Sequence, residues 1–355
     1  MYKYLIGPII SLILAILFAE PLLKLKKNII KRLKYWWFKS KIDLPKPETL
    51  SLGSIQTTFL VIDGDGELYY SPDTIICRVV GKPLELPSEV MQLKSNIETK
   101  NLEMKNRGET FAYNGPLFAL GGYAISRTIP SENLELSLSL YKTDYYTFLA
   151  TVGSLDCKLA TPPAVWTIRS AYLSDIDYSR PVPFLATGFG IALVVITRDN
   201  KIIVTKRGEQ TAIRPGEYDI SVAEAMHPVF DRLDNSPNPS IYRTGIRGAM
   251  EEIGVTLFEK DIIYLGFGVD AQYYQWEVIG MAKTNDTSDA IMERRSKGTG
   301  GKWEVKHIEF INADPKAVLI YIKNHRLWSI AKAALYWTLV YEFGKNKVER
   351  ILINL

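Results

Sequence analysis

The sequence predicts an α+β fold that follows an N-terminal transmembrane helix. Three observations support this fold class: a long apolar run at residues 4–23, strand-like patterns that recur between 57 and 311, and helical patterns over 315–343. Strands, a helix, more strands and then helices indicate a mixed architecture and not a parallel doubly wound sheet. The 355 residues are enough for one large domain with extensions or for two smaller domains.

The apolar run from Tyr4 to Leu23 is interrupted only by Glu20. At about 1.5 Å per residue it would extend roughly 30 Å, which matches the hydrocarbon core of a bilayer. A cleaved signal peptide carries its positive charge before the apolar run, whereas here the basic residues follow it. We therefore expect residues 1–23 to be a retained membrane anchor.

Positive charge is concentrated directly after this run. Residues 24–41 contain eight Lys or Arg and no acidic residue, and 24–47 would form a basic juxtamembrane segment and linker that contacts membrane lipid. The bias of basic residues towards the cytoplasm then places the C-terminal body there, behind a single membrane pass. Because eight charges exceed the net charge of +4, the remaining chain is acidic, which argues against a nucleic-acid partner.

The body divides into a β-rich extension, expected at 48–109, and a larger core. Within the core, residues 189–208 read as two apolar strands around an Asp-Asn turn. The helix that follows should end at Gly254. The other expected elements are strands at 57–70, 74–80, 132–141, 261–270, 272–282 and 304–311, and helices at 87–106, 315–324 and 329–343.

The stretch RGAMEEIGV, residues 247–255, carries the clearest chemical pattern. On a helix, Gly248, Glu251 and Glu252 are spaced i, i+3 and i+4 and share one face. Neighbouring carboxylates of this kind hold Mg²⁺, which polarises a diphosphate and activates water. Glycine occupies position 248, where a third helical carboxylate would complete the cluster.

These residues resemble the second half of the Nudix box, G-x5-E-x7-R-E-U-x-E-E-x-G-U, with Gly248 in place of its first helical glutamate. The segments YNGPLFAL and TDYYTFLAT are similar to elements that precede the core in UDP-sugar Nudix hydrolases. The resemblance implies a Nudix-like α/β/α sandwich at 181–345 with an upstream flank at 110–180. Mg²⁺ would be its cofactor, although no residue pattern establishes one. The implied metal ligands are Glu251, Glu252 and Glu224, the candidate catalytic residues Glu251 and Glu252, and the ligand-binding residues Arg207, Glu224 and Arg247.

An anchor fused to such a domain resembles the single-span Nudix effectors of CBASS, the bacterial antiviral systems in which a CD-NTase cyclase makes a cyclic nucleotide signal. The resemblance implies a receptor in the cell inner membrane that senses the cyclic nucleotide, forms homo-oligomers and disrupts the membrane. The alternative is a membrane-tethered pyrophosphohydrolase that acts on a nucleotide sugar or another nucleoside diphosphate derivative. Because Gly248 removes one carboxylate, the sequence favours the receptor over the enzyme.

Overall fold

The computed structural model describes residues 49–355 except for 129–132, 162–163, 175, 210, 212 and 298–304. The predicted membrane span from Tyr4 to Leu23 and the basic stretch 24–41 lie outside this part of the chain. None of the helices in the described part is long and apolar enough to cross a bilayer. The predicted single-pass architecture and inner-membrane location are corrected on this finding, because the described chain offers no helix for them. Residues 47–355 form one compact unit, and the finer domain boundaries expected from the sequence stay predictions.

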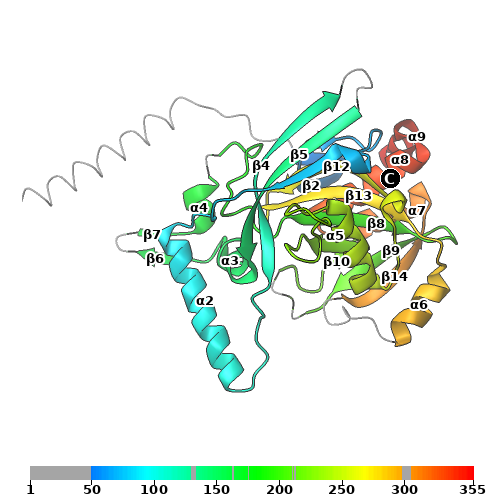
Figure 1. Cartoon of the computed structure of the whole chain (residues 1–355). Helices are drawn as coiled ribbons and strands as arrows, with labels where there is room; N and C mark the ends of the chain where they lie inside the picture. Colours follow the sequence, from blue (N-terminus) through cyan, green and yellow to red (C-terminus); the bar gives the residue numbers. More distant parts are fainter. Residues whose placement is uncertain are drawn as a thin grey trace, which may run out of the picture. The chain divides into compact units, whose positions relative to one another are not determined.

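The largest sheet in the described chain is mixed and has nine strands (Figure 1). Its members are β1 (Thr49–Leu52), β2 (Ile55–Gly64), β12 (Ile262–Asp270), β13 (Gln275–Lys283), β8 (Gly190–Ile196), β9 (Lys201–Arg207), β10 (Tyr218–Asp219), β11 (Val222–Ala225) and β14 (Val305–Asn312). Strands β13 and β8 pair in parallel, and the other pairs in this sheet are antiparallel. Because β2 pairs with β12, part of the segment expected as an extension belongs to the main sheet.

Helices cover both faces of this sheet. The described helices are α2 (Ser88–Asn106), α3 (Tyr145–Ala150), α4 (Ile168–Tyr172), α5 (Ile241–Gly248), α6 (Ser288–Lys297), α7 (Pro315–Asn324), α8 (Ser329–Phe343) and α9 (Lys345–Ile353). Along β8, Ile191, Leu193 and Val195 join the core that includes α5, while Ala192 and Val194 join the core with α7 and α8. Burial on both faces explains why β8 is apolar throughout and does not alternate with polar residues.

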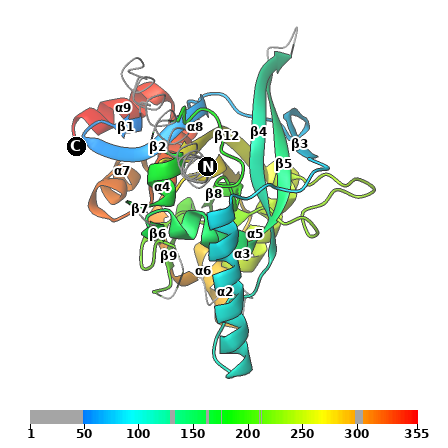
Figure 2. The ribbon, with the colours of Figure 1, turned by 90° about the vertical axis from the view of Figure 1, so that its left-hand side faces the viewer.

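A smaller sheet and helix α2 flank the main sheet. The strands β3 (Ile75–Val79), β5 (Asn133–Asp144) and β4 (Pro116–Thr128) form a three-stranded sheet in that order. A short pair, β6 (Leu159–Thr161) with β7 (Ala164–Trp166), lies apart from it. Figure 2 shows α2 extending away from the rest of the unit, with α3 beside its first turns.

The expected hairpin at 189–208 opens beyond its turn. Strands β8 and β9 pair only at Ile196 and Ile202, next to the turn at Asp199-Asn200. Further along this edge, β8 pairs with β11 instead, while β13 pairs with the other edge of β8 along its whole length. Ser221 bridges the gap, because its hydroxyl donates to the carbonyl of Ile203 at 2.6 Å and accepts from the amide of Val195 at 2.7 Å. The opening brings β11, which carries Glu224, beneath helix α5.

Candidate functional site

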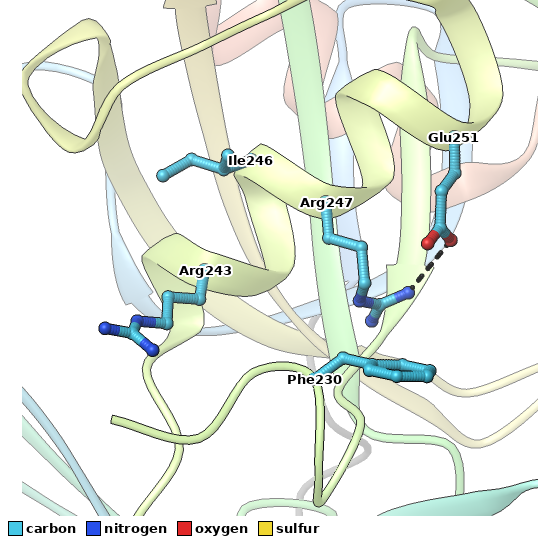
Figure 3. Close-up of a pocket in the computed structure, with 5 residues that line it drawn as sticks. All are labelled: Phe230, Arg243, Ile246, Arg247 and Glu251. Atoms are coloured by element: carbon cyan, nitrogen blue, oxygen red, sulfur yellow. Dashed lines mark hydrogen bonds and ion pairs between the residues drawn. The ribbon is translucent and has the colours of Figure 1, made fainter. Parts of the chain in front are cut away.

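An open pocket of about 470 Å³ lies between helix α5 and the loop that follows β11 (Figure 3). Arg243, Arg247 and Glu251 project from successive turns of α5 and of the π-helical turn Ala249–Ile253 that extends it. Ile246 and Phe230 complete the lining, and the Phe230 ring faces the helix from the loop. The pocket therefore combines an apolar wall with charged groups of both signs.

Arg247 is the centre of the charge network at this pocket. Its Nε and Nη2 bind the two carboxylate oxygens of Asp231 at 2.8 and 3.0 Å, and Nη2 also donates to the carbonyl of Ala225 at 2.9 Å. Nη1 donates to Glu224 at 2.9 Å and to Glu251 at 3.2 Å. A guanidinium has five N–H donors, so these contacts use all of them. Arg247 organises the carboxylates and has no donor left for a ligand.

Asp231 fixes the loop onto the helix from a fully buried position. It accepts from the backbone amide of His227 at 2.7 Å and from the Thr244 hydroxyl at 2.9 Å, in addition to the two bonds from Arg247. Burial by itself lowers the pKa of Arg247, but the hydrogen bonds to Asp231 and the charge of Glu224 raise that pKa well above its ordinary value. The guanidinium is therefore charged at neutral pH.

His227 positions the aromatic wall. Its Nδ1 accepts hydrogen bonds from the backbone amides of Val229 and Phe230, both at 3.1 Å. The imidazole stacks on the Phe230 ring with centroids 4.3 Å apart, and Phe230 is 67% exposed. Burial, reinforced by the charge of Arg247, lowers the pKa of His227, which keeps the ring neutral at neutral pH. Phe230 thus presents an aromatic surface at the pocket, and stacking on His227 holds its ring in place.

The glycine at 248 is required by the packing of α5 on β11. A Cβ atom at this position would lie 2.7 Å from Cγ1 of Val222 and 2.8 Å from Cβ of Glu224, closer than carbon atoms approach without displacement. Helix α5 therefore approaches the sheet where the motif would need a glutamate. A glutamate at this position would require the helix, Val222 or Glu224 to move.

The structure brings most of the predicted site residues together, but not all of them. Glu251 lines the pocket, with its side chain 52% exposed, while Glu252 is nearly buried and accepts from the amide of Ala223 at 3.1 Å. Arg207 lies elsewhere, at the end of β9, where its Nη1 is 3.9 Å from Asp219.

Among the described residues, no group of three or more His, Cys, Asp and Glu could hold a metal ion. The predicted Mg²⁺ site is not assembled there, because Arg247 occupies the position between Glu224 and Glu251.

A second polar centre, which sequence reasoning missed, lies on the α8 side of the sheet. Arg214 is buried with a left-handed φ of 55°, its Nη1 binds Asp219 at 2.7 Å, and its guanidinium carbon lies 3.6 Å from the Trp328 ring centroid. Nε of Arg214, Oε1 of Gln275 and Oε2 of Glu277 are buried without a hydrogen-bond partner in the described chain. The sequence feature that could have indicated this centre is Glu277, which interrupts the apolar pattern of the strand QWEVIGMA with a polar residue.

We expect Glu277 to make stability depend on pH. Burial, and to a lesser degree the charges of Asp219 and Asp270, raise its pKa well above the ordinary value, despite the opposing charge of Arg214. Its neutral form therefore stabilises the fold fully below about pH 4.3, and this contribution is lost as pH rises towards the raised pKa. Urea unfolding should show that the free energy of unfolding of Glu277→Gln rises relative to that of wild type by about 1.4 kcal/mol for each pH unit above pH 5. Glu98→Gln on the exposed side of α2 is the control. The prediction would be contradicted if both variants differed from wild type in unfolding free energy by the same amount at every pH.

Comparisons with known proteins do not establish a family. No family model matches the chain, and no curated protein matches it. Among solved structures it is similar to the crystal structure of DR0079 from Deinococcus radiodurans, with 12% identity and a TM-score of 0.30. The similarity covers 41% of this chain and 80% of that one. A TM-score this low does not show a shared fold.

The predicted membership of the Nudix family, and with it the antiviral CBASS assignment, is corrected on these findings. The structure gives local reasons for the short match at 247–255. Arg247 forms ion pairs with Glu224 and Asp231, Ala249 and Val255 are buried, and Gly254 ends the helix with a φ of 71°. These positions meet packing and capping needs, so the motif by itself carries no assignment of chemistry.

Proposed function

We propose that this protein is a nucleotide receptor that binds its ligand in the pocket beside α5 and leaves it intact. The observation that carries the proposal is Phe230, whose exposed ring is stacked on His227 and faces the pocket. Aromatic rings held in this way bind nucleobases, and each stacked base contributes about 1–3 kcal/mol. A nucleobase on Phe230 would pack its other edge towards Ile246 on α5.

Arg243 supports a phosphate at the same pocket. It binds Asp234 at 2.8 and 3.2 Å and the carbonyl of Arg232 at 2.6 Å. The Asp234 side chain is 84% exposed, so water competes for this ion pair and its contribution to stability is small. A phosphate can therefore replace Asp234 on Arg243, whereas the donors of Arg247 are already in use.

The charge network favours binding over hydrolysis. Diphosphate hydrolysis by paired carboxylates needs those carboxylates to hold a metal ion. Here Glu224 and Glu251 share the guanidinium of Arg247, and the packing at Gly248 leaves no room for another carboxylate. Hydrolysis of a nucleotide sugar is the competing function, and recovery of an unchanged nucleotide sugar after incubation with Mg²⁺ distinguishes binding from hydrolysis.

The test is calorimetric titration of the full chain with nucleoside monophosphates, cyclic di- and trinucleotides and nucleotide sugars. We expect at least one class to bind, with an affinity about tenfold weaker in Phe230→Ala and in Arg243→Ala. Phe258→Ala and Arg180→Ala are matched controls: Phe258 is 60% exposed outside the pocket, and Arg180 pairs with the exposed Asp177. No binding by any member of the panel, or equal losses in variants and controls, would overturn the proposal.

A further inference from the structure

The pocket is polarised along helix α5. Arg243 stands at one end and Glu251 two turns further on, a separation of eight residues or about 12 Å along the helix axis. Arg247 lies between them with every donor engaged. At the far end, Glu224 lies within reach of the same Nη1 as Glu251, so two carboxylates meet there. A phosphate is repelled by that end and attracted by Arg243.

Glu251 offers an acceptor at the acidic end. Its Oε2 accepts from Arg247 at 3.2 Å, and no hydrogen bond to its Oε1 comes from the residues that the structure describes. The side chain is 52% exposed and lines the pocket. Each carboxylate oxygen has two lone pairs, so Oε2 can also accept a second bond. The carboxylate is therefore available to an edge that presents N–H donors.

The order of groups in the pocket orients a nucleotide. Arg243, Phe230 and Glu251 all line the pocket, with Arg243 and Glu251 at its opposite ends. A nucleotide with its phosphate on Arg243 and its base stacked on Phe230 would therefore direct the edge of the base towards Glu251. Guanine presents two adjacent donors there, N1–H and the N2 amino group, which match the two oxygens of one carboxylate. Adenine and cytosine place a ring-nitrogen acceptor beside their amino group, and uracil flanks its N–H with two carbonyl oxygens. Those acceptors face the negative charge of Glu251, which disfavours them.

We infer that the pocket selects guanine nucleotides and that Glu251 is the residue that recognises the Watson–Crick edge of the base. The inference rests on the proposed nucleotide-binding function and adds the identity of the base to it. A paired donor edge on a carboxylate discriminates between bases by about tenfold or more. Glu251 is a binding residue in this account, and Arg247 holds it in position.

The experiment is calorimetric titration of the full chain with GMP, IMP, AMP, CMP and UMP. GMP should bind about tenfold tighter than AMP, CMP and UMP, and IMP, which keeps N1–H but lacks the amino group, should fall between them. Glu251→Gln places an amide donor opposite the base and should weaken the binding of GMP about tenfold without weakening the binding of AMP. Glu293→Gln, which removes a comparable glutamate paired with Lys297 four residues on, is the control and should change neither affinity.

The outcomes separate the two proposals. If AMP and GMP bind equally and Phe230→Ala weakens both, the selection of guanine is overturned while nucleotide binding stands. If Glu251→Gln weakens all five ligands equally, the residue acts on the fold of the pocket and does not read the base, which also overturns the inference. If none of the five binds and cyclic and sugar nucleotides also fail, the proposed function falls with it.

Discussion

Replacing Arg247 by methionine is expected to lower the free energy of unfolding by about 3–5 kcal/mol. The change leaves the fully buried Asp231 without its counterion and removes the bonds that hold Glu224 and Glu251. Methionine keeps much of the aliphatic volume of the arginine side chain. The loss of unfolding free energy therefore results from the broken charge network and not from a new cavity. Urea unfolding monitored by circular dichroism measures it directly.

Two variants sharpen this prediction. Arg180→Met removes an arginine from an exposed pair with Asp177 and should change stability by less than about 1 kcal/mol. Asp231→Asn combined with Arg247→Met removes both buried charges, and the double variant should lose less than the sum of the two single losses. A loss below about 1 kcal/mol for Arg247→Met would show that the network does not hold the loop on the helix.

Replacing Gly248 by glutamate is expected to destabilise the fold and to create no hydrolase. The new Cβ would meet Val222 and Glu224 at atoms near their backbones, which cannot swing aside as the end of a long side chain can. Overpacking of this kind costs about 1–3 kcal/mol, and the added carboxylate places another negative charge beside Glu224. Differential scanning calorimetry gives the stability, and release of nucleoside monophosphate from UDP-glucose with Mg²⁺ gives the activity.

The smaller change Gly248→Ala isolates the packing term. In an unhindered helix interior, alanine in place of glycine gains about 1 kcal/mol, so a net loss here reports the close approach of α5 to β11. Gly81→Ala, with nothing within 4 Å of the added carbon, is the control and should be nearly neutral. A stable Gly248→Glu protein that hydrolyses UDP-glucose would restore the reading of 247–255 as a weakened catalytic helix.

Local sequence signals predicted the elements near the site well. Helices α7 and α8 have the bounds that their apolar patterns indicated, and Gly254 ends the helix through its left-handed backbone. Such features depend on residues close together in the chain, so they are visible without the fold. The turn at Asp199-Asn200 was visible for the same reason, with Asn200 at a φ of 58°.

The site itself depends on contacts between distant segments. The role of Arg247 is set by Asp231, which comes from the loop between β11 and α5. The limit on position 248 comes from β11, which lies beneath α5 only because β8 and β9 separate beyond their turn. The motif at 247–255 indicated the helix that lines the pocket. The metal-dependent hydrolysis that it implied is not supported by the residues that surround this helix.

Nucleotide binding without hydrolysis is tested most directly by titration of the full chain with GDP-mannose in the presence of Mg²⁺, with chromatography of the same samples after incubation. We expect GDP-mannose to bind and to be recovered unchanged, and we expect Phe230→Ala to weaken the binding about tenfold while Phe258→Ala leaves it unchanged. Release of GMP that Glu251→Gln abolishes would contradict it and make the pocket an active site.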